Sequence, residues 1–461
     1  MVTLSLIIWL LSIIGLIILP RFLFINRSFS LIVIYAIIGQ TLGVIFRSIM
    51  IMNEWDKAIG PSGDYVPHPS LVSAFYLYIS LFNLCLVLGA CFVALPIQVL
   101  RKNKEKSNRE EEVITRKVIS SNRMKYTLFL ISLPGLILIL KSILFGSNLL
   151  NSTDVEANRI NVSGEGLSIL VMEIPVTCMI LWYSFKKGKI TPRWIISMIV
   201  LVFLFLLTGN RSKMVMVVLL LVGVLIQCQG YKSIVKKIPQ VSMLGVIVLY
   251  LGWSIIHIRG ALLKYGGTFG YWLKDALLTN PIDIIVAIYR SSFNGYDGFL
   301  SILSNVPDRF HYRWGQFWYE SFTGIIPRTF WQGKWEVPMT NDFTRDVWGW
   351  DQGGMFVTGP GVLYLDGGFW GIFFGGIITG ALIVIFIEIC KKVFINEDWM
   401  YRFLVSSVAF FLCRFMFAGG SNDVIFLHRL IIQSIIIISI INLKISLNKY
   451  EKGNVKLSIK K

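Results

Sequence analysis

Arginines recur in the short polar segments that separate long apolar stretches of this chain. A guanidinium group stays charged at any ordinary pH and can bind a phosphate through two parallel hydrogen bonds. A set of such arginines therefore predicts a site for a ligand that carries phosphate. The set consists of Arg159, Arg211, Arg290, Arg328 and Arg429, the last of which follows His428.

Arg211 is the strongest candidate of this set. It lies in the very short segment Thr208-Gly-Asn-Arg-Ser-Lys213, so that two cations share one turn between two apolar stretches. Binding to phospholipid headgroups is the alternative explanation for any single arginine. For Arg211 and Lys213 the tight turn favours a substrate phosphate.

The apolar stretches identify the elements that must position these arginines. The chain has 461 residues, of which 55% are hydrophobic and 15% charged, against roughly 45–50% and 25% in soluble domains. The excess falls in non-alternating blocks of about 20 residues, the length of a transmembrane helix. We predict an all-α polytopic integral membrane protein with about 11 spans. They lie near 3–20, 30–51, 71–97, 127–145, 167–185, 194–208, 213–228, 241–258, 361–389, 403–418 and 430–447.

Charge indicates the orientation. Most of the 44 Lys and Arg residues fall in connecting segments that lie on one side if there are eleven spans. By the positive-inside rule, the N-terminus is outside and the C-terminus is cytoplasmic. The net charge of +18 then reflects the topology and attracts the protein to anionic membrane lipid. No array of basic and aromatic residues predicts nucleic-acid binding. The expected parts are helices in 1–258, a large external loop at 259–360, and helices with a cytoplasmic tail in 361–461.

The external loop is rich in Trp and Tyr, and segments 270–278 and 282–289 are predicted to be short amphipathic helices. Aromatic side chains suit sugar faces and also anchor loops at the membrane interface, and their density here favours a loop that lies on the membrane. No cysteine or histidine spacing predicts a disulfide or a metal site, and no cleavable signal peptide is evident.

Ionisable residues inside the apolar stretches are functional candidates, because charge at membrane depth is costly. Arg47 and Lys141 are expected to reach the nearby outer boundary, which relieves this cost. Glu173 and Arg414 are a candidate pair.

Several short motifs add to this pattern. Thr208-Gly-Asn-Arg211 precedes an apolar span, and Val155-Glu-Ala-Asn-Arg159 lies in an earlier loop. A third series of residues runs through Ile325-Ile-Pro-Arg-Thr-Phe-Trp331, Asn341, Gly353-Gly354, Pro360, Tyr364 and Gly367-Gly368, with Asp366 beside Tyr364.

In these motifs and in its layout, the chain resembles the Wzy family of oligosaccharide repeat-unit polymerases, which make O-antigen and enterobacterial common antigen. The resemblance implies a GT-C-like glycosyltransferase of the bacterial cytoplasmic (inner) membrane, acting on its outer face in lipopolysaccharide and related polysaccharide biosynthesis. Its substrate would be an oligosaccharide linked to undecaprenyl pyrophosphate, and a chain-length regulator is a possible partner. No metal or other cofactor is implied.

The resemblance also implies roles for residues. Arg211 and Arg290 would stabilise the pyrophosphate leaving group, and His428 is our first candidate for the catalytic base. His311, Asp423 and Glu320 remain alternative bases. Residues expected to bind pyrophosphate or glycan are Arg159, Lys213, Arg328, Arg414, Arg429 and Tyr364.

Three other functions remain open. An O-antigen ligase would use similar arginine chemistry with a different acceptor. A metal-dependent glycosyltransferase using lipid-phosphate sugars is suggested by Glu54-Trp-Asp56, although its long loop would come first rather than late. A lipid-linked oligosaccharide flippase or other transporter would show paired, broken helices in two matching halves, and the two halves of this sequence do not match.

Overall fold

A computed structural model describes most of the chain. The described residues are 1–22, 27–52, 58–60, 63–105, 121–145, 166–189, 191–207, 212–230, 250, 253–254, 257–258, 261, 265–266, 268–288, 294–324, 326, 331, 338–349, 356–394, 398–420, 424–425 and 427–441.

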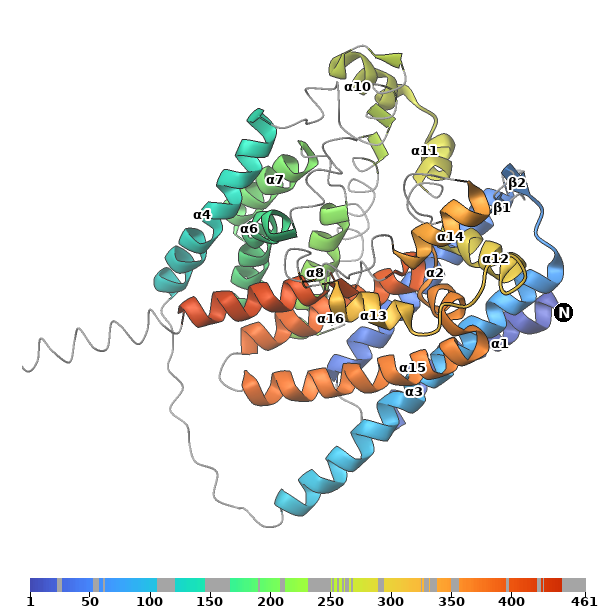
Figure 1. Cartoon of the computed structure of the whole chain (residues 1–461). Helices are drawn as coiled ribbons and strands as arrows, with labels where there is room; N and C mark the ends of the chain where they lie inside the picture. Colours follow the sequence, from blue (N-terminus) through green and yellow to red (C-terminus); the bar gives the residue numbers. More distant parts are fainter. Residues whose placement is uncertain are drawn as a thin grey trace, which may run out of the picture. The chain divides into compact units, whose positions relative to one another are not determined.

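The described part is almost entirely helical (Figure 1). Its first half contains α1 (Val2–Phe22), α2 (Arg27–Met52), α3 (Pro69–Glu105), α4 (Ser121–Phe145), α6 (Gly166–Phe185), α7 (Pro192–Leu207) and α8 (Ser212–Gln229). Its second half contains α10 (Phe269–Leu278), α11 (Pro281–Ile288), α12 (Gly295–Asn305), α13 (Gln316–Thr323), α14 (Met339–Trp348), α15 (Gly359–Val393) and α16 (Asp398–Ala418), followed by an apolar helix at Leu427–Ile441. Strands β1 (Ala58–Gly60) and β2 (Gly63–Tyr65) form a small antiparallel hairpin.

The helices have the length and composition of membrane spans. Five described helices are long and apolar enough to cross a membrane, and shorter apolar helices accompany them. Each predicted span coincides with a helix except 241–258, most of which lies outside the described residues. The predicted short helices at 270–278 and 282–289 are confirmed as α10 and α11. The total of eleven spans and their orientation remain predictions.

The chain divides into two compact units. Unit 1 contains residues 1–114, 278–395 and 405–427, and unit 2 contains 115–277, 396–404 and 428–461. The boundaries at 258 and 360 that we predicted from topology remain a separate prediction.

In unit 1, α15 packs closely along α3 (Figure 1). Glycines make this approach possible. A Cβ atom on Gly89 would lie within 2 Å of the Ile377 carbonyl oxygen, and one on Gly380 would lie 2.0 Å from the Leu86 carbonyl oxygen. Small residues at such contacts let helix backbones approach, which is the usual basis of helix association in membranes.

A buried polar network ties α1, α2 and α3 together. The Trp9 indole N–H donates to Gln40 Oε1 at 3.2 Å, and the Gln40 amide donates to Asn83 Oδ1 at 2.8 Å. The Asn83 amide donates in turn to Ser12 Oγ at 3.0 Å. These bonds satisfy polar groups that would otherwise be costly in an apolar interior.

Unit 2 has its own polar contact, centred on Gln433 in the Leu427–Ile441 helix. Its Oε1 accepts a hydrogen bond from Thr177 of α6 at 2.6 Å, and its Nε2 donates to the Leu170 carbonyl at 2.8 Å. Glu173 of α6 lies beside it and 4.0 Å from Arg429. These contacts join α6 to the Leu427–Ile441 helix within the unit.

Candidate functional site

The loop before α13 is anchored to α15 by its backbone. The Trp314 N–H donates to the Asp366 carbonyl at 2.7 Å. Asp366 Oδ1 accepts from the N–H groups of Gly315 at 2.9 Å and Phe317 at 3.3 Å. Asp366 thus supplies, from another helix, the acceptor that the first N–H groups of α13 require.

A break in α15 follows directly after this anchor. Gly368 has φ 59° and ψ −139°, a conformation essentially restricted to glycine. A Cβ atom there would also lie 2.9 Å from the Tyr312 ring. Tyr312 in turn packs near Tyr364, whose ring centroid is 5.0 Å from that of Tyr78 on α3. The break therefore leaves room for the Tyr312 ring of the loop to pack against α15.

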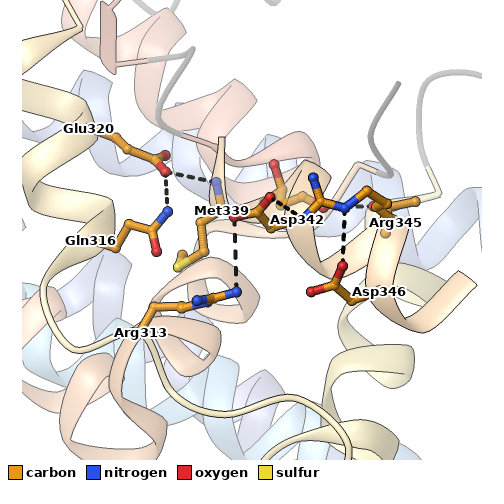
Figure 2. Close-up of polar contacts among 9 residues, drawn as sticks. Arg313, Gln316, Glu320, Met339, Asp342, Arg345 and Asp346 are labelled. Atoms are coloured by element: carbon orange, nitrogen blue, oxygen red, sulfur yellow. Dashed lines mark hydrogen bonds and ion pairs between the residues drawn. The ribbon is translucent and has the colours of Figure 1, made fainter. Parts of the chain in front are cut away.

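Helices α13 and α14 are joined by the Glu320 carboxylate (Figure 2). Glu320 Oε1 accepts from Gln316 Nε2 at 2.8 Å and from the Met339 backbone N–H at 2.8 Å. Glu320 is buried, as are Gln316 and Met339. The bond to the Met339 N–H connects α13 to α14, and the bond from Gln316 orients the Glu320 carboxyl group.

Two arginines lie near Asp342 of α14, Arg345 from α14 itself and Arg313 from the loop before α13 (Figure 2). Arg345 Nη2 lies 3.0 Å from Asp342 Oδ1, and its Nε donates to Asp346 at 3.1 Å. The hydrogen bond with Asp346 and the charge of Asp342 raise the pKa of the Arg345 guanidinium. Arg313 Nη2 lies 4.0 Å from Asp342 Oδ2.

A buried ion pair lies elsewhere in unit 1. Arg47 of α2 is 3.5 Å from Asp297 in the first turn of α12. Burial raises the pKa of the neighbouring Tyr296 hydroxyl well above its usual value. Arg47 is therefore buried beside an acidic partner within the protein, and its depth in the membrane remains a prediction.

The arginines that carried the sequence prediction lie largely outside the described residues. This holds for Arg159, Arg211, Arg290 and Arg328, and for the side chain of Lys213 at the start of α8. Asp423 is also outside them. Their grouping into one site remains a prediction.

The other predicted site residues are described. His428 and Arg429 belong to unit 2, where Arg429 pairs with Glu173. Tyr364 and the half-buried Arg414 belong to unit 1. His311 is exposed in the loop before α13.

Sequence reasoning missed Arg313, Gln316, Asp342 and Arg345. Arg313 lies in Phe310-His-Tyr-Arg-Trp-Gly315, a cation set among aromatic residues, and that local signal could have drawn attention to it. The pairing of Arg313 with Asp342 could not have been predicted locally, because Asp342 belongs to a helix farther along the chain.

Among the described residues, no group of three or more His, Cys, Asp and Glu side chains could hold a metal ion. The chain matches no protein-family model, no curated protein sequence and no solved structure.

Proposed function

We propose that the protein is a membrane glycosyltransferase that polymerises oligosaccharide repeat units carried on undecaprenyl pyrophosphate. It acts at the outer face of a bacterial cytoplasmic membrane, with its N-terminus outside and its C-terminus in the cytoplasm. The motifs around Arg211 and Tyr364 resemble those of the Wzy family, and the long apolar helices support a location in a membrane.

One structural observation supports this proposal best. The segment 310–317, which carries Tyr312, Arg313 and Trp314, is fastened to the start of the long apolar helix α15 by Asp366. A lipid-linked glycan has an apolar tail and a polar head, so its enzyme needs polar and aromatic side chains where apolar helices begin.

The reaction requires stabilisation of a pyrophosphate leaving group. The bond from the pyrophosphate oxygen to the anomeric carbon breaks, and a hydroxyl oxygen of the acceptor sugar bonds to that carbon. Each well-placed cationic donor at the departing oxygen contributes about 3–4 kcal/mol to the barrier reduction. Arg211 and Arg290 are assigned this role, with Arg159, Lys213, Arg328, Arg414 and Arg429 contributing to binding.

The acceptor hydroxyl must lose its proton to a base. Glu320 already accepts a hydrogen bond from Gln316 within α13 and one from the Met339 N–H that links α13 to α14, which favours a positioning role for it. His428 has a buried Nδ1 without a hydrogen-bond partner among the described residues, and His311 is exposed. We therefore propose His428 as the catalytic base.

The decisive experiment is deletion of the gene in its host, followed by electrophoresis of the surface polysaccharide. A ladder that collapses to a single-repeat band supports a polymerase. Loss of all glycan from the final acceptor would instead identify a ligase. An unchanged ladder would reject both, and accumulation of repeat units on the cytoplasmic face would identify a flippase.

Complementation with variants of Arg211 tests the chemistry. Arg211→Ala should abolish polymerisation, and Arg211→Lys should retain little, because lysine lacks the bidentate fork. Membrane protein levels are compared by immunoblot. Full polymerisation by Arg211→Ala at the wild-type protein level would show that Arg211 is not part of the site.

A further inference from the structure

The side chain of Trp314 is held out from the protein at a strained position of the backbone. Its φ is 33°, a left-handed value that residues other than glycine seldom adopt. The indole is 69% exposed. A Cβ atom on Gly367 would lie 3.5 Å from its ring, so Trp314 rests against the α15 break on one side. Strain of this kind persists where the surrounding contacts impose it, and it gathers at binding sites.

Two polar atoms of the same turn lack partners. Arg313 Nε and Gln316 Oε1 are buried and have no hydrogen-bond partner among the described residues. The Gln316 orientation is fixed, because its Nε2 donates to Glu320. In Figure 2 its oxygen lies on the side of Arg313. The Gln316 residue is 4% exposed, and such a buried acceptor calls for a partner.

The two atoms are complementary in type. Arg313 Nε is a donor only, and Gln316 Oε1 is an acceptor only. The two residues belong to one backbone turn, since the Gln316 N–H donates to the Arg313 carbonyl at 3.3 Å. The Arg313 guanidinium is also steadied by the Phe310 ring, 4.6 Å from its centroid. A hydroxyl group, which both donates and accepts, suits this combination.

The charges near this turn argue against a phosphate. Among the residues labelled in Figure 2, the guanidinium groups of Arg313 and Arg345 are accompanied by three carboxylates, those of Glu320, Asp342 and Asp346. An added anion would meet this excess of negative charge. A neutral ligand with hydroxyl groups meets no such penalty.

We propose that the turn 312–316 is a binding site for a neutral sugar residue. The exposed face of Trp314 stacks on the sugar ring, while Arg313 Nε donates to a ring hydroxyl and Gln316 Oε1 accepts from one. This proposal rests on the proposed function and deepens it, because it assigns the turn to the glycan rather than to the pyrophosphate. The arginines predicted for the diphosphate thus serve a different part of the substrate.

The test measures binding of free oligosaccharide to the full-length protein in detergent. The probe is the host's own repeat unit, released from its lipid pyrophosphate by mild acid, and inorganic pyrophosphate is the charged competitor. Wild type should bind the oligosaccharide, and Trp314→Ala should weaken binding about tenfold or more. Trp314→Phe should recover most of the affinity, since it restores an aromatic face.

Two further variants sharpen the result. Arg313→Lys keeps the positive charge near Asp342 but lacks the Nε–H donor, so it should weaken binding about fivefold. Trp370→Ala removes another exposed tryptophan, which lies in the apolar part of α15, and should bind as wild type does. Melting temperatures of all variants are compared to confirm that they are folded.

Several outcomes would overturn the site. These are equal binding by wild type and Trp314→Ala, displacement of the oligosaccharide by pyrophosphate, or no binding to wild type at millimolar concentration. The assay contains no lipid and no turnover. If the polymerase proposal fails, the binding result can therefore still be interpreted. If the sugar site fails, the polymerase proposal is unaffected.

Discussion

Two ionic groups in unit 1 use the same residue types in opposite environments. Arg47 and Asp297, which join α2 to α12, have side chains only 4% and 0% exposed. Arg345 and Asp346 on α14 are 46% and 45% exposed. The buried pair joins the first turn of α12 to the apolar helix α2, whereas the exposed pair lies on the surface of α14. Similar distances between charged atoms therefore correspond to different roles.

The energetic difference follows from the loss of water. A buried charge whose ion-pair partner is removed loses that attraction without regaining water, which costs about 3–5 kcal/mol. An exposed charge recovers its hydration at once. The buried pair should therefore control folding of unit 1, and the exposed pair should not.

The largest effect is expected from Arg47→Met or Asp297→Leu alone. Each leaves one charge buried and should destabilise the protein by about 3–5 kcal/mol. Thermal unfolding in detergent, followed by size-exclusion chromatography, measures the loss. The double variant Arg47→Met with Asp297→Leu should recover most of the stability, because no charge is then left unpaired.

The double variant also decides the interpretation. If both single variants melt at the wild-type temperature, the pair does not anchor α12. If the double variant is less stable than either single one, packing rather than charge pairing would explain the loss.

The partner of Arg47 shows what cannot be predicted from the sequence. Membrane spans depend on the composition of a continuous stretch, so long apolar helices such as α3 and α15 could be predicted closely. The partner of Arg47 lies in a helix far along the chain, and no local pattern indicates Asp297. An unpaired arginine near a span end then had to be interpreted as reaching water.

The candidate site shows the same limit. Glu320 was considered as a base because it is an acidic residue in the loop, but its role depends on the Met339 N–H. The sequence marks Asp366 only as a neighbour of Tyr364. The N–H groups that donate to its carboxylate belong to Gly315 and Phe317, in a different segment. Residue types could be predicted from sequence, and their pairing could not.

An intermediate effect is expected at Asp366, which is buried like Arg47 but binds backbone N–H groups rather than a cation. Asp366→Ala removes a charged acceptor from Gly315 and Phe317 and should cost about 1.5–3 kcal/mol. Asp366→Asn retains an oxygen acceptor and should cost less. Unfolding in detergent ranks the variants, and limited proteolysis should cut the 310–317 segment first in Asp366→Ala. Equal stability of wild type and Asp366→Ala would show that other contacts hold this loop.

The smallest effect is expected from Arg345→Ala, at the exposed end of the comparison. The exposed Asp346 can be hydrated when the guanidinium is gone, and the buried Asp342 still has Arg313 nearby. The melting temperature should therefore stay within measurement error of wild type. The matched double variant Arg345→Ala with Asp346→Ala should behave the same, and added salt should shift wild type and variants equally. A marked drop in melting temperature would mean that the surface of α14 is covered in the folded protein. The contrast with Arg47 and Asp297 would then reflect differences in packing rather than in access to water.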